Sequence, residues 1–172
     1  YSEDFSNAAW FKSGNITLGT PTTELGFNMT TLTDADATSY SSTHLVVTLA
    51  SSTVYTMSGY IARNSSATSE ASLRIDQTDN VLGPLYSGIS INPTDGTITT
   101  LSTWGSNVTS SDVIPYGPDH YFWYVTLTTP ANMASSRLAI FPAHYDIAGA
   151  GAATKVGSNS FGGLQIEAGS TP

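Results

Sequence analysis

Apolar and polar residues alternate with a period of two through most of the chain, in short runs separated by Gly, Pro, Asn, Asp and Ser. Such alternation is typical of β-strands that bury one face and expose the other. In residues 54–63, for example, Met57 and Ile61 share one face and Tyr60 lies on the opposite face. The pattern predicts ten strands: residues 15–20, 27–32, 44–50, 54–63, 72–77, 85–91, 97–101, 121–128, 137–141 and 163–168.

The composition supports an all-β chain that folds around a core of its own. Of the 172 residues, 40% are hydrophobic and only 10% are charged, against about 25% charged residues in typical soluble domains. No segment combines a helical period with capping residues. We therefore expect residues 1–172 to form one antiparallel β-sandwich module, and we interpret the chain as a piece excised from a larger protein.

Charge and cysteine content exclude several function classes. With 5 basic and 13 acidic residues, the net charge is −8. No basic cluster offsets this charge, so we expect no nucleic-acid partner. No run of 18 apolar residues occurs, and we expect no membrane insertion. The absence of cysteine excludes disulfides, thiolate zinc sites and a cysteine nucleophile.

Five phrases in the chain resemble, in the same order, a jelly-roll carbohydrate-binding module found in phage tail fibres and tailspikes and appended to polysaccharide-degrading enzymes. They are residues 1–10 (YSEDFSNAAW), 55–62 (YTMSGYIA), 95–98 (DGTI), 121–128 (YFWYVTLT) and 163–172 (GLQIEAGSTP). Two positions depart from the family pattern, because Ala62 replaces a lysine and Tyr124 replaces an arginine.

This resemblance implies a jelly roll that binds a polysaccharide or cell-surface glycan on a concave sheet face and catalyses nothing. It also implies an extracellular or virion-associated location, as part of a phage tail protein or a glycan-degrading enzyme. No cofactor is required. Members of the family can hold a structural Ca²⁺ between the N-terminal segment and the last strand, and here the matching carboxylates are Glu3, Asp4 and Glu167.

A sugar-binding face needs aromatic rings for stacking and polar groups for paired hydrogen bonds. The alternation places the following candidates opposite the core: Tyr60, Arg74, Asp76, Phe122, Tyr124 and Gln165. Alternatively, Phe122 and Tyr124 pack beneath a loop or in a second core layer. Trp104, in a loop-like segment, is either a platform at the rim of the site or a plug over the sandwich edge. Tyr86, near a turn, is a weaker platform candidate.

Two catalytic alternatives have thin support. Glycoside hydrolysis needs a facing carboxylate pair, for which Asp76 and Glu167 are the strand residues available. A lyase would use Tyr124 as base beside Arg74. The three histidines form no metal-ligand spacing and no nucleophile–base arrangement, so we expect a non-catalytic protein.

A structural role is the main alternative to glycan binding. The face that carries Tyr60, Phe122 and Tyr124 could instead be an apolar contact that holds a homotrimer together within a tail fibre.

Overall fold

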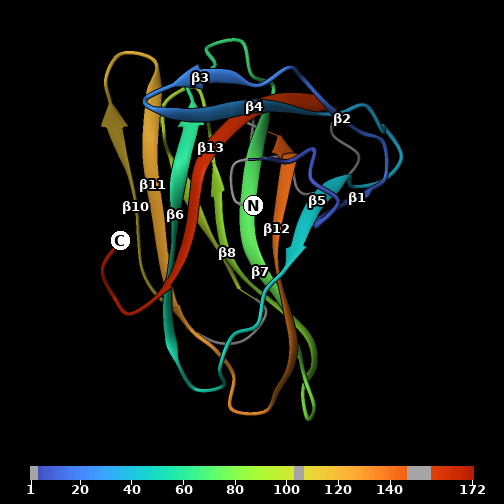
Figure 1. The fold of residues 1–172 in the computed structure, drawn as a ribbon, viewed down its shortest axis with the longest axis vertical. Helices are drawn as coiled ribbons and strands as arrows, with labels where there is room; N and C mark the ends of the chain where they lie inside the picture. Colours follow the sequence, from blue (N-terminus) through green and yellow to red (C-terminus); the bar gives the residue numbers. More distant parts are fainter. Residues whose placement is uncertain (1–3, 103–106, 147–155) are drawn as a thin grey trace.

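The computed structural model describes residues 4–102, 107–146 and 156–172, and these residues form two antiparallel β-sheets that face each other. The six-stranded sheet has the order β1 (Trp10–Ser13), β5 (Ser42–Val46), β12 (Met133–Asp146), β7 (Ser69–Asp79), β8 (Gly83–Ile91) and β9 (Ile98–Ser102). The seven-stranded sheet has the order β10 (Val108–Tyr116), β11 (His120–Thr128), β6 (Val54–Ala62), β13 (Gly157–Ala168), β4 (Phe27–Asp34) and β2 (Ile16–Leu18), with β3 (Thr22–Glu24) paired to β4. In Figure 1, β6, β11 and β13 lie in front of β7 and β8. Within these ranges the structure contains no helix that could cross a membrane.

The core lies between the two sheets, and the alternation correctly predicted which side chains enter it. Trp123, Val125 and Leu127 of β11 are fully buried, as is Ile61 of β6. From the other sheet they meet apolar side chains of β7, β8 and β12 in one cluster: Leu73, Ile75, Ile89, Ile91 and Ile140. The outward residues of the same strands are left to form two separate outer surfaces.

All ten predicted ranges contain a strand, but three further strands carry too little alternation to be recognised. β1 exposes three of its four residues, β3 pairs only with β4, and β10 is an edge strand that is mostly exposed. A strand with little buried surface has no need of apolar residues at every second position. The predicted strand 44–50 also ends early, because β5 stops at Val46.

A β-bulge in β13 changes which residues of the last strand face the core. The register with β6 shifts between Gly162 and Gln165, and Gly163 adopts a φ of 58°. Phe161 and Leu164, three positions apart, are therefore both buried. A Cβ atom on Gly163 would lie 3.0 Å from the Tyr60 ring and 3.1 Å from the Phe27 ring, so glycine at this position lets these two rings lie close to the backbone.

Candidate functional site

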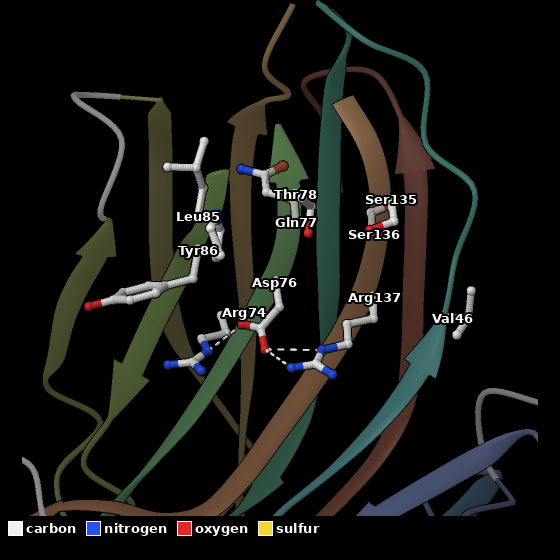
Figure 2. A pocket seen from close by; sticks show the side chains of 11 residues that line it. Val46, Arg74, Asp76, Gln77, Thr78, Leu85, Tyr86, Ser135, Ser136 and Arg137 are labelled. Carbon is white, nitrogen blue, oxygen red and sulfur yellow. Dashed lines mark hydrogen bonds and ion pairs between the residues drawn. The ribbon is translucent and has the colours of Figure 1, made fainter. Parts of the chain in front are cut away.

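A groove of about 540 Å³ opens on the outer face of the six-stranded sheet. Its lining comes from β5, β7, β8 and β12 and from the ends of these strands (Figure 2). The lining residues are Val46, Arg74, Asp76, Gln77, Thr78, Pro84, Leu85, Tyr86, Ser135, Ser136 and Arg137. Because β-strands point successive side chains to opposite faces, the alternate residues Arg74, Asp76 and Thr78 all lie on the outer face.

Two arginines share one carboxylate in this groove. The Nε atom of Arg74 donates to Oδ1 of Asp76 at 2.6 Å, and Arg137 donates to Oδ2 through Nε at 3.3 Å and Nη2 at 3.1 Å. Figure 2 shows the two guanidinium groups reaching Asp76 from either side. The side chains of Arg74 and Asp76 are only 16% and 14% exposed, whereas that of Arg137 is 48% exposed. The Arg137 guanidinium is thus held in place and is still open to solvent.

Aromatic rings fix the position of Arg74. Its Cζ atom lies 4.6 Å from the centroid of the Tyr86 ring and 4.2 Å from that of Phe141. Tyr86 is partly exposed and is the direct cross-strand partner of Asp76. Cation–π contacts of this kind orient the guanidinium plane. The result is an aromatic ring next to a fixed set of charged hydrogen-bonding groups.

A buried histidine lies beyond Phe141. His144 is 4% exposed, its ring centroid is 5.0 Å from that of Phe141, and its Nδ1 atom is 2.6 Å from Oγ of Ser72. Burial, reinforced by the positive charge of Arg74, lowers the pKa of His144 to about 4. The imidazole is therefore neutral at neutral pH and adds no charge beside Arg74.

Gln77 borders the groove, but it lies between the outward residues Asp76 and Thr78, so its side chain points to the inner side of β7. Its side chain is 3% exposed, and neither Oε1 nor Nε2 has a hydrogen-bond partner among the described residues. A buried amide without partners costs about 1–3 kcal/mol.

The prediction that all the candidate residues share one surface is wrong. Arg74 and Asp76 lie on β7 in the six-stranded sheet. The remaining described candidates lie on the outer face of the seven-stranded sheet, on β6, β11 and β13: Tyr60, Phe122, Tyr124 and Gln165. Local alternation shows whether a side chain points out of the sandwich, but it does not show which sheet carries the strand.

The rings on the seven-stranded sheet form a second aromatic surface, made of Phe27, Tyr60, Tyr116 and Phe122. The Tyr60 centroid lies 4.8 Å from that of Phe27, 5.1 Å from that of Tyr116 and 5.3 Å from that of Phe122. Burial raises the pKa of Tyr60. These rings pack on one another at tilted angles, so they do not make one flat platform.

Four predicted residues remain: Trp104, Glu3, Asp4 and Glu167. Trp104 and Glu3 lie outside the described residues. Asp4 accepts hydrogen bonds from the backbone N and Oγ of Ser6, and Glu167 is exposed on β13. Within the described ranges, no three His, Cys, Asp or Glu side chains gather as metal ligands, and the Ca²⁺ site stays a prediction.

Both catalytic alternatives lose their proposed geometry. Asp76 and Glu167 lie on different sheets, and so do Tyr124 and Arg74. In addition, both carboxylate oxygens of Asp76 accept hydrogen bonds from arginine. Neither pair can act together on one bond of a bound ligand.

The sequence carries only weak signals for two of the groove residues. It indicates Tyr86 only as a weak platform candidate, and it does not single out Arg137 as a binding residue. Both follow from the period-two pattern, since Tyr86 alternates with Leu85 and Ser87, and Arg137 alternates with Ser136 and Leu138, all of which are buried.

Comparison with known proteins gives similarity of structure without similarity of sequence. No protein-family model matches the chain, and no significant match was found among curated protein sequences. A xylan-binding domain from carbohydrate-binding module family 22 matches with a TM-score of 0.53 and 12% identity, over 98% of this chain and 93% of that one.

Two larger proteins contain a similar unit. The Clostridium thermocellum xylanase 10B structure, which joins a family 22 module to a GH10 module, matches with a TM-score of 0.55 and 11% identity over 100% of this chain. The enzymatically active domain of tailspike protein 4 of bacteriophage CBA120 matches with a TM-score of 0.53 and 12% identity over 97% of this chain. This chain spans 28% of the xylanase chain and 20% of the tailspike chain. The architecture and these matches together identify the chain as a jelly-roll β-sandwich with the fold of the carbohydrate-binding modules.

Proposed function

We propose that this chain is a non-catalytic module that binds a polysaccharide or cell-surface glycan in the groove of the six-stranded sheet. The observation that carries the proposal is the combination of the Tyr86 ring and the Arg74–Asp76–Arg137 array in one open groove. Ligand sites of this kind pair an apolar contact surface with a few fixed polar groups.

The groove offers both kinds of contact that a sugar ring needs. The C–H face of a pyranose can stack on Tyr86. Hydroxyl groups can then accept hydrogen bonds from the exposed guanidinium of Arg137. Because Asp76 and the aromatic rings already hold Arg74 in place, little side-chain entropy is lost on binding.

The similar structures support the same proposal. The family 22 domain is described as xylan-binding, and one Clostridium thermocellum structure was solved with xylohexaose. By analogy, we place this chain outside the cell or on a virion, as an accessory module of a glycan-degrading enzyme or a phage tail protein.

The Tyr86→Ala variant tests the location of the site. Loss of the stacking ring is expected to weaken glycan binding about tenfold, since aromatic contacts contribute on the order of 1 kcal/mol beyond the area they bury. Affinity electrophoresis against a polysaccharide panel, followed by titration calorimetry, measures the change.

The matched control is Tyr124→Ala combined with Tyr60→Ala, which removes two tyrosines from the other sheet. Circular dichroism should show that both proteins remain folded. Loss of binding in the double variant alone would move the site to the second aromatic surface and contradict the proposed groove.

A structural role within a tail fibre is the second candidate. On the edge strand β10, Tyr116 of the second aromatic surface is 47% exposed, and Ile114, which pairs with Phe122 of that surface, is 44% exposed. Light scattering of the isolated chain distinguishes the two candidates: a trimer that binds no glycan supports the structural role.

A further inference from the structure

We propose that the groove selects acidic saccharides, in which a sugar carboxylate pairs with Arg74 and Arg137. This inference rests on the proposed function, and it names the class of ligand that the same site prefers. It comes from the distribution of charge in the molecule and from the unused donors of the two guanidinium groups.

Positive charge is scarce in this chain, yet it is concentrated in the groove. The net charge is −8 and only 5 residues are lysine or arginine. Two of these five, Arg74 and Arg137, line the groove, where Asp76 is the one acidic lining residue. The groove residues therefore carry a net charge of +1 in a strongly acidic protein. A neutral ligand could be bound by the hydrogen bonds of amide side chains, without a local excess of positive charge.

The hydrogen bonds to Asp76 occupy only some of the donors of the two arginines. Both oxygens of Asp76 already accept hydrogen bonds, from Nε of Arg74 and from Nε and Nη2 of Arg137. Three guanidinium nitrogen atoms have no hydrogen-bond partner among the described residues: the two Nη atoms of Arg74 and Nη1 of Arg137. Each guanidinium thus keeps N–H groups that can bind a further acceptor.

The burial of Arg74 makes a charged acceptor the better partner. A ligand that fills the groove removes water from a guanidinium that is already only 16% exposed. A hydroxyl group replaces the hydrogen bonds of that water but leaves the surplus charge uncompensated. A carboxylate replaces the hydrogen bonds and also neutralises the charge, and its planar geometry matches the arginine fork.

The test compares polymers that differ only in the carboxyl group. The probes are polygalacturonate, alginate and glucuronan, each measured beside its carboxyl-reduced neutral form. Titrations at about 0.15 M salt keep the Debye length near 8 Å, which screens the distant negative charges of the protein. We expect at least one polyuronate to bind tenfold or more tightly than its neutral form.

The Arg137→Gln variant assigns this preference to the groove. Arg137 is 48% exposed, so its replacement should leave the fold intact, and the preference for the carboxylate form should fall to threefold or less. Arg63→Gln is the matched control, because Arg63 also lies over an aromatic ring, 4.3 Å from the Tyr121 centroid, but does not line the groove. It should keep the full preference.

The outcomes separate the two proposals. Equal or tighter binding of the neutral forms overturns the acidic-saccharide inference and leaves glycan binding standing. If the chain binds neither member of any pair, nor any polymer of the wider panel, both proposals fail. A preference that survives Arg137→Gln, or that disappears in Arg63→Gln, also overturns the assignment to this site.

Discussion

Replacement of Gly88 by alanine is expected to lower the free energy of unfolding by about 3 kcal/mol, near the upper end for overpacked sites, and to weaken ligand binding as well. Gly88 lies on β8 directly opposite Arg74 on β7. A Cβ atom there would lie 2.1 Å from the backbone oxygen of Leu73 and 2.6 Å from Cβ of Arg74. Since backbone atoms cannot move aside as a flexible side chain can, β7 and β8 must separate locally.

Urea denaturation measures the loss of stability, and calorimetry with the best ligand of the panel measures the loss of binding. Gly19→Ala is the matched control, because a Cβ atom at Gly19 would lie 3.2 Å from Cβ of Thr31, a much milder contact. If both variants lose the same small amount of stability, the result contradicts a steric clash between a Cβ atom at position 88 and the backbone of β7.

Acidification from pH 7 to pH 4 is expected to remove about 3 kcal/mol of stability through His144 alone. Its pKa is about 4 in the folded protein and near 6.5 when unfolded, so the unfolded chain binds the proton more readily. The contribution of His144 is therefore complete above pH 6.5 and is lost progressively as the pH falls towards 4. Because His144 is only 4% exposed, solvent screens little of this cost.

The control for this effect is His144→Phe, whose ring can pack against Phe141 and Tyr40 in place of the imidazole. Its urea midpoint should change much less between pH 7 and pH 4.5. The carboxylate of Asp36, whose hydrogen bonds to Thr38 lower its pKa to about 2, stays charged in this range. Equal pH dependence in both proteins would contradict the role given to His144.

The sandwich was predictable because its strands are amphipathic one by one. The alternation in β11 correctly placed Trp123 inside, and the alternation in β7 correctly placed Arg74 outside. Such a pattern shows which face of a strand is buried, and it can be read from the residues of that strand alone. The resemblance in five short phrases pointed to the jelly roll, and the similar solved structures confirm that fold at 11–12% identity.

The site was only partly predictable, because a site depends on which strands become neighbours. Arg74 and Tyr60 both point outward from the core, yet they are separated by the full thickness of the sandwich, on β7 and β6. Pairing of β12 with β7 brings Arg137 to Asp76 across 61 positions of sequence. No local pattern contains that pairing, so the ion pair between Arg137 and Asp76 could be found only in the folded structure.

On β7, core residues alternate with groove residues, and this arrangement has a consequence for how such a protein can change over evolutionary time. Leu73 and Ile75 hold the sheets together, while Arg74 and Asp76, between and beside them, touch the groove. A lineage can therefore exchange the groove residues one after another and acquire a new ligand while the residues that stabilise the fold stay unchanged. The fold and the ligand specificity can therefore change independently in evolution, although the residues that determine them lie on the same strand.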